Sequence, residues 1–288
     1  MTHLQQLERE LGNHYSRTYK ANVKGQCRRF IAVVGEKPTY SRADITGYVD
    51  RLIKNGQNNA SIRMALSCIK VLCRAIDCPY PVTGAVHLPR VAYDPQQPTL
   101  EPLEVRRLIA GAKREDQVTR AIVALATLYG FRAIELTGVI NRGCDGTTVA
   151  LITAKTATER AHHAPTGVES WLTCPPTPMS QDLVHDCFQR LMKRYVRKLR
   201  PREGWHAVRR ALATGLFLAL PHDEPAVLEF MGWQVPGSPR RRNYYKPSES
   251  QKQAVWREID RKVYQVHPFI RYWLQPADEP LPGFEVNP

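Results

Sequence analysis

The sequence predicts a mainly helical α+β protein in two domains, with a small β-sheet inside the second. Three features predict this fold class: helix-period apolar spacing up to about residue 80, a proline-crowded segment over 81–98, and a short β-branched stretch within the helical pattern that follows. With 288 residues, 43% of them hydrophobic, the chain is long enough for two domains that each bury a core.

The first expected domain, residues 1–80, is a bundle of amphipathic helices. Ser41 precedes RADITGYVDRLI and can cap that helix, and Asn58, Asn59 and Ser61 open the next run, SIRMALSCIKVLCRAI, after a stop at Gly56. Proline cannot continue a helix and biases the preceding residue to extended conformations. The segment 81–98 is therefore predicted to be a linker.

The second expected domain covers residues 99–247. It opens with TLEPLEVRRLIAG, a capped helix with acidic residues in its first turn, and continues with TRAIVALATLYG. The β-branched stretch over 147–153 predicts a short strand. Two further amphipathic helices, MSQDLVHDCFQRLMKRYVRKLR and GWHAVRRALATGLFLAL, follow. The tail over 248–288 is expected to be helical and to end in a proline-rich stub.

The charge balance points to a polyanionic partner. Lys and Arg number 41 against 27 Asp and Glu, a formal net charge of +14. Each neutralised phosphate releases counterions, so nucleic acid is the first candidate. No stretch approaches ~20 uninterrupted apolar residues, and the first residues lack the apolar core of a signal peptide. We therefore expect a soluble, cytoplasmic protein.

The seven cysteines are an odd and scattered set without a CxxC pair. This pattern argues against both a zinc site and a disulfide framework. Cys68, Cys73 and Cys78 recur every five residues, which does not keep them on one helical face. We interpret the cysteines as reduced core residues, and no metal is expected.

Three separated segments of the second domain carry residue types suited to cutting a phosphodiester. An attacking hydroxyl requires positive charge around the non-bridging oxygens, a proton donor for the leaving oxygen and an activated nucleophile. The segments are LATLYGFRAIELTGV at 125–139, WHAVRRALATGLF at 205–217 and FMGWQVPGSPRRRNYYKP at 230–247. In this order, after a helical domain and a linker, they resemble the three boxes of the tyrosine recombinase (phage integrase) family of site-specific DNA recombinases.

The resemblance assigns phosphate binding to the first two boxes. Arg132 is the first arginine, and Glu135, one helical turn on, holds its guanidinium. A guanidinium donates two parallel hydrogen bonds to a phosphate and stays charged. His206 and Arg209 are three apart, so one helical face presents both groups, and the imidazole can shuttle a proton. Arg210 points elsewhere.

The third box supplies the nucleophile. Trp233 stands where most of the family has histidine, and its indole N–H can donate to the scissile phosphate. Tyr244 is the expected nucleophile, although it lies eleven positions after Trp233, a longer interval than the family's usual one, and the adjacent Tyr245 is the alternative. Lys155, in LITAKTATERAHHAP, resembles the family's hairpin lysine, which is the general acid.

The resemblance also implies an architecture and a reaction. Residues 1–80 would be a core-binding (SAM-like) DNA-binding domain and 99–247 the catalytic domain, clamping opposite sides of a DNA duplex. The tyrosine would form a 3′-phosphotyrosine and release a 5′-hydroxyl, without ATP, metal or another cofactor. By the same resemblance the protein would act as a homo-tetramer on two DNA sites. The tail 248–288 would dock on a neighbouring protomer or pack within its own chain.

Other functions remain open at this stage. A type IB topoisomerase-like enzyme or a hairpin telomere resolvase would use the same residues, and the long interval before Tyr244 also suits a non-catalytic DNA-binding relative. An RNA-binding protein is disfavoured because the chain has no aromatic-rich RNP-like strand. The sequence leaves open the target site, the host element, any accessory factor and the choice between integration, excision and resolution.

Overall fold

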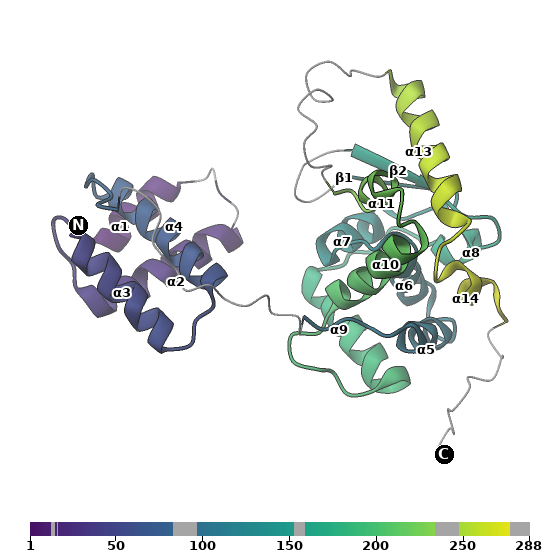
Figure 1. Ribbon diagram of the computed structural model, residues 1–288, viewed down its shortest axis with the longest axis horizontal. Coiled ribbons are helices and arrows are strands. Elements are labelled where there is room, and N and C mark those ends of the chain that lie inside the picture. The colour runs from purple at the N-terminus through teal and green to yellow at the C-terminus, as the bar shows by residue number, and fades with distance from the viewer. Residues whose placement is uncertain (13–14, 16, 83–96, 153–158, 234–247, 277–288) are drawn as a thin grey trace. The chain divides into compact units, whose positions relative to one another are not determined.

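The computed structural model divides the chain into two compact units, Met1–Pro95 (unit 1) and Gln96–Pro288 (unit 2) (Figure 1). The division falls within the segment for which a linker is predicted. Helices dominate both units and unit 2 holds a two-stranded sheet, so the predicted fold class is confirmed. The structure describes residues 1–12, 15, 17–82, 97–152, 159–233 and 248–276.

Unit 1 is a bundle of helices, α1 (His3–Leu11), α2 (Arg17–Val34), α3 (Arg42–Lys54) and α4 (Asn59–Ala75). The predicted cap at Ser41 is confirmed, and of the three polar residues expected to open the next helix, Asn58 is its cap. The Ser41 hydroxyl accepts from the backbone N–H of Asp44 at 3.2 Å, and the Asn58 side chain accepts from that of Ser61 at 2.8 Å. These bonds satisfy N–H groups that have no partner in the first turn of a helix.

The core of unit 1 contains its four cysteines. Cys27, Cys68, Cys73 and Cys78 are buried among the apolar faces of the helices, and all are free thiols. Burial raises the pKa of Cys27 and of Cys73 to about 12, which keeps both thiols protonated. Within the described ranges no three His, Cys, Asp or Glu side chains gather closely enough to hold a metal ion.

The described part of unit 2 is mainly helical and contains one pair of strands. Strand β1 pairs antiparallel with β2, from Thr148 opposite His163 to Ile152 opposite Glu159, which confirms the predicted strand. The elements are α5 (Pro102–Ala112), α6 (Gln117–Tyr129), α7 (Ala133–Arg142), β1 (Thr148–Ile152), β2 (Glu159–His163), α8 (Glu169–Leu172), α9 (Gln181–Leu191), the π-helical turn η1 (Met192–Val196), α10 (Trp205–Ala219), α11 (Glu224–Phe230), α13 (Glu249–Tyr264) and α14 (Ile270–Leu274).

Helix α6 is the centre of the core of unit 2. Its residues from Ala121 to Tyr129 are all buried, because α5, α7, α8 and α10 surround it. A helix that is apolar on every side must be enclosed in this way. With 13 residues α6 is too short for a bilayer, and none of the described helices is long and apolar enough to span a membrane.

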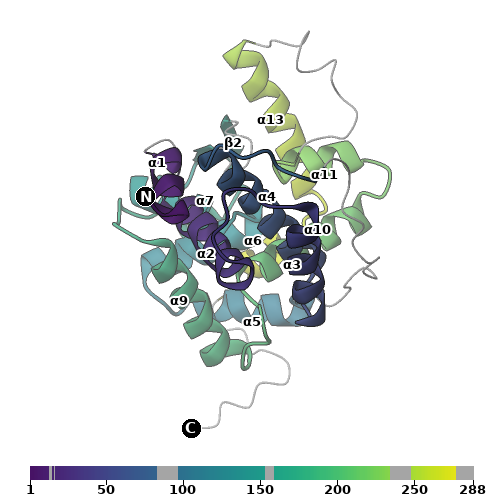
Figure 2. The ribbon, with the colours of Figure 1, turned by 90° about the vertical axis from the view of Figure 1, so that its left-hand side faces the viewer.

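The described part of the tail packs on unit 2 of its own chain. Helix α13 passes β2 and α11, and its N-terminal end projects from the unit in both views (Figures 1 and 2). Helix α14 lies against α5 and α6, where the Trp273 indole N–H donates to the Thr127 hydroxyl at 2.9 Å. Lys113 also donates to the backbone carbonyls of Tyr272 and Gln275.

A buried histidine joins α14 to the end of α6. His267 donates from Nε2 to the carbonyl of Leu128 at 3.0 Å, because a carbonyl can only accept. Its Nδ1 accepts from the backbone N–H groups of Phe269 and Ile270, each at 3.2 Å. Both ring nitrogens are thus used by the neutral imidazole. Burial lowers the pKa of His267 to about 4.

This histidine predicts a pH-dependent stability. Between pH 6.5 and about 4 the unfolded chain binds a proton at His267 that the folded chain does not. The free energy of unfolding of unit 2 should therefore fall as the pH falls through this window, with a slope up to about 1.4 kcal/mol per pH unit for one group. Burial also lowers the pKa of His162, which adds in the same direction.

Urea unfolding of the full chain at a series of pH values measures this slope. His267→Gln keeps a donor for the Leu128 carbonyl but removes the titrating group, so its stability should depend less on pH than that of the wild type. An equal slope in both proteins would contradict the assignment.

Candidate active site

Arg132 stands at a tight turn between α6 and α7. Gly130 ends α6 in the left-handed region, with φ 65°, a backbone conformation that favours glycine. Arg132 is then the N-cap residue of α7. The Glu135 carboxylate accepts from the backbone N–H of Arg132 at 2.8 Å and from its Nη1 at 2.7 Å. Glu135 therefore makes the contact with Arg132 that the spacing predicted, and the role of both residues in catalysis stays a prediction.

Arg209, on α10, belongs to the second of the three sequence segments and bonds to the backbone of the first and the third. Its Nη1 donates to the carbonyl of Gly130 and its Nη2 to the carbonyl of Met231. The residue is 5% exposed. Desolvation and the nearby positive charge of Arg132 lower its pKa to about 10, so the guanidinium still carries its charge at neutral pH.

Trp233 lies beside the same guanidinium. The Cζ atom of Arg209 is 5.2 Å from the centroid of the Trp233 ring, within the range of a cation–π contact. The backbone N–H of Trp233 donates to the carbonyl of Leu228 at 2.8 Å, across Gly232 in the left-handed region (φ 64°). This helix-ending motif fixes the chain direction after α11, and Trp233 is held next to Arg209.

His206 lies at the surface of the same region. It is the second residue of α10, three before Arg209, and its side chain is exposed. It lines a surface pocket together with Ala133, the residue that follows Arg132. The adjacent Arg210 instead bonds the carbonyl of Pro98, so it points away as expected.

The structure therefore brings Arg132, Glu135, Arg209 and Trp233 together, with His206 at the edge. The other three predicted residues, Lys155, Tyr244 and Tyr245, lie outside the described residues. Their roles stay predictions from the sequence.

A buried polar cluster beside this site was not predicted from the sequence. It consists of Arg160, His162 and His163 on β2 and Asp260 on α13, linked by hydrogen bonds. Arg160 and His162 alternate on a strand, which places them on one face, but nothing in the sequence pattern marks that face as buried. Their partner Asp260 is 98 residues from His162, a separation that local patterns do not register.

The site is strongly electropositive. The charges of Arg132 and Arg160 both act to lower the pKa of Arg209, so each of these guanidiniums lies within electrostatic range of Arg209. Arg160 is itself buried, and its Nη2 has no hydrogen-bond partner within the described parts of the chain. Like charges gathered in this way favour an anion with several acceptor oxygens.

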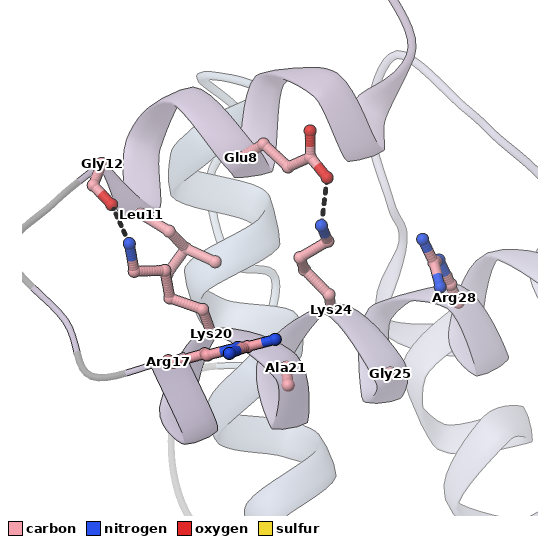
Figure 3. Close-up of a pocket in the computed structure, with 9 residues that line it drawn as sticks. All are labelled: Glu8, Leu11, Gly12, Arg17, Lys20, Ala21, Lys24, Gly25 and Arg28. Carbon is pink, nitrogen blue, oxygen red and sulfur yellow. Dashed lines mark hydrogen bonds and ion pairs between the residues drawn. The ribbon is translucent and has the colours of Figure 1, made fainter.

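Unit 1 carries a second basic surface, the pocket between α1 and α2 (Figure 3). Arg17, Lys20, Lys24 and Arg28 recur at helical spacing along one face of α2. Lys20 donates to the carbonyl of Gly12, and Lys24 pairs with a Glu8 carboxylate oxygen. The side chains of Arg17 and Arg28 are exposed.

The hydrogen bonds between Glu135 and Arg132 predict that losing the Glu135 carboxylate destabilises unit 2. An amide has one acceptor oxygen, so in Glu135→Gln one of the two N–H groups of Arg132 loses its partner and faces another donor. We expect the free energy of unfolding of unit 2 to fall by about 1–3 kcal/mol. Urea unfolding measures it, with Glu224→Gln, an exposed position at the start of α11, as the matched control. Equal stabilities of the two variants would contradict the expectation.

Comparison with known proteins identifies the fold. No protein-family model and no curated protein matches the chain. Among solved structures it is similar to the Tn1549 transposon integrase in complex with transposon right end DNA, with a TM-score of 0.56, 15% identity and coverage of 91% of this chain and 99% of that one. It is also similar to a lambda integrase dimer bound to a COC′ core site, with a TM-score of 0.55, 16% identity and coverage of 86% of this chain and 100% of that one.

A third similar structure is the XerH site-specific recombinase bound to its difH substrate, with a TM-score of 0.53, 14% identity and coverage of 81% of this chain and 76% of that one. At these identities the likeness establishes the fold. The chain has the fold of the tyrosine recombinases and integrases.

Proposed function

We propose that the chain is a site-specific DNA recombinase or integrase that breaks and rejoins DNA strands through a 3′-phosphotyrosine. The observation that carries the proposal is the position of Arg209, whose guanidinium is bonded to the Gly130 turn and to the end of α11. Segments far apart in the sequence are thereby joined around one positive site, in a fold whose similar solved structures are recombinases and integrases bound to DNA.

In this proposal two arginines bind the scissile phosphate. A guanidinium has five N–H donors. Arg209 uses one from each Nη on the two carbonyls and keeps others for a phosphate oxygen. Arg132 is fixed by Glu135 and neutralises the other non-bridging oxygen. The positive charge opposes the negative charge that develops on the phosphate in the transition state.

His206 and Trp233 complete the binding of the phosphate. His206 is exposed at the edge of the site, where an imidazole can exchange a proton with the reacting groups near neutral pH. The Trp233 indole offers one N–H donor beside Arg209.

The covalent step uses residues assigned from the sequence. The phenol of Tyr244, or alternatively of Tyr245, gives its proton to His206 as its oxygen attacks phosphorus, and the bond to the 5′ oxygen breaks. Lys155 gives that oxygen its proton. A 5′-hydroxyl later attacks the phosphotyrosine and the tyrosine leaves. The phosphodiester energy is kept in the protein–DNA bond, so neither ATP nor another cofactor is needed.

The proposed partner is double-stranded DNA, on which the protein would work in the cytoplasm. One of the similar structures is a lambda integrase tetramer bound to a Holliday junction, with a TM-score of 0.52. By analogy we propose a homo-tetramer on two DNA sites. The described part of the tail packs on its own chain.

A trapping experiment tests the covalent step. A pool of nicked duplexes with a randomised arm is incubated with the protein in EDTA and denatured, and protein-linked DNA is recovered and sequenced. We expect a covalent adduct that survives denaturation, because a nicked strand lets the 5′-hydroxyl fragment leave. Tyr244→Phe should abolish the adduct and Tyr245→Phe should retain it.

The outcomes separate the alternatives. Loss of the adduct in Tyr245→Phe alone would move the nucleophile to Tyr245. A linked strand that rejoins only to its own partner would favour a type IB topoisomerase-like enzyme, and a closed hairpin at a duplex end would favour a telomere resolvase. If the wild type forms no adduct, the proposal of an enzyme is wrong, and the interpretation as a non-catalytic DNA-binding protein is favoured.

The basic pocket of unit 1 gives a separate test of DNA binding. We propose that Arg17 and Arg28 contact the phosphate backbone. The double variant Arg17→Ala/Arg28→Ala should bind the selected duplex more weakly, and its affinity should depend less on salt, because each lost phosphate contact lowers the slope of log K against log salt by about 0.9. Fluorescence anisotropy over a salt series measures both, with Lys54→Ala on α3 as the control. An unchanged slope would exclude this face.

A further inference from the structure

We propose that Asp260 is a positioning residue for strand cleavage: its buried carboxylate clamps α13 to β2. This inference rests on the proposed function, because it concerns the two elements that directly follow the candidate proton donor and nucleophile. The clamp consists of Asp260, Arg257 and Tyr264 on α13 and His162 and His163 on β2.

The carboxylate is held by both histidines. Asp260 is 1% exposed, and its Oδ2 accepts from the backbone N–H of His163 at 2.8 Å. Its Oδ1 lies 3.0 Å from Nδ1 of His162. Arg160 donates from Nε to Nε2 of His162 at 3.1 Å, so Nε2 is the acceptor of a neutral ring and Nδ1 carries the proton. The Nδ1–H group therefore donates to Asp260.

Two further residues of the helix face the same strand. Arg257 donates from Nε to Nε2 of His163 at 3.2 Å, and the Tyr264 hydroxyl donates to the carbonyl of His163. Residues 257, 260 and 264 are spaced by three and four, so they lie on one face of α13. Three side chains of one helix thus bond to the end of a single strand.

The clamp is packed against the segments that Arg209 joins. The His162 ring stacks on Tyr129, with centroids 4.6 Å apart, and Tyr129 directly precedes the Gly130 turn. The same ring meets Phe230 edge-on at 4.9 Å, and Phe230 directly precedes Met231, whose carbonyl binds Arg209. The clamp and the candidate active site therefore share one core.

Chain connectivity links the clamp to the chemistry. Lys155 lies four residues before the first residue of β2, and Tyr244 lies five before the first residue of α13. Asp260 fixes α13 near its C-terminal end, and the opposite end projects from unit 2 (Figures 1 and 2). A helix is stiff and rises 1.5 Å per residue, so Glu249 lies about 16 Å from Asp260. A small rotation at the clamp would displace that end considerably.

The test compares Asp260→Asn with Glu258→Gln. Both variants remove one carboxylate from α13, but Glu258 is exposed and pairs with Arg261 on the same helix. Hydrogen exchange of the free protein, DNA affinity and the single-turnover rate of adduct formation are measured on the full chain. In Asp260→Asn we expect about tenfold faster amide exchange confined to α13 and β2, because a buried charge-assisted pair is lost.

The DNA affinity and the rate of adduct formation distinguish a positioning role of Asp260 from a purely structural one. Asp260→Asn should bind the selected duplex within about twofold of the wild type and form the adduct about tenfold more slowly, since misplacing a reacting group costs rate rather than affinity. Glu258→Gln should match the wild type in all arms. If Asp260→Asn does not fold, Arg257→Ala, which removes an exposed donor of the clamp, should show a smaller change of the same sign.

Three results would overturn the inference: a folded Asp260→Asn that cleaves at the wild-type rate, an equal loss of affinity and rate, or faster exchange spread over all of unit 2. Failure of the proposed function is recognised separately, because the wild type itself would then form no adduct.

Discussion

The structure of unit 2 depends on one buried guanidinium. Arg209 lies where burial disfavours a charge, and it is retained because two backbone carbonyls, of Gly130 and Met231, accept its hydrogen bonds. One carbonyl ends α6 and the other follows α11, so a single side chain fixes the distance between them. An arginine suits this bridge because its rigid, planar fork points separate Nη donors at the two carbonyls, while its remaining N–H groups stay available.

The same arrangement has an electrostatic cost, because like charges are held close to Arg209. Arg132 and Arg160 add positive charge close to Arg209, and Glu135 already uses both carboxylate oxygens on Arg132. An anion bound there would relieve the repulsion and stabilise the folded unit. A phosphate of a DNA backbone fits, since it offers several acceptor oxygens to planar donors. The stability and the proposed chemistry of the site thus depend on the same charges.

Local patterns predicted much of the fold and part of the site. Ser41 and Asn58 cap their helices because capping depends on neighbouring residues, and Glu135 supports Arg132 for the same reason. The spacing of His206 and Arg209 predicted a shared helical face but not that Arg209 would be buried and His206 exposed, because depth depends on which elements pack above each residue. The contact between His162 and Asp260 depends on tertiary packing between distant segments, which no local pattern contains.

The tail after the candidate tyrosines belongs to the framework of unit 2. Asp260 joins α13 to β2, while His267 and Trp273 join the following residues to α6. These contacts are buried, so releasing the tail would expose polar groups that lose their partners together with the apolar surface of α6. Exchange of the whole tail between protomers would therefore require another chain to supply the same contacts.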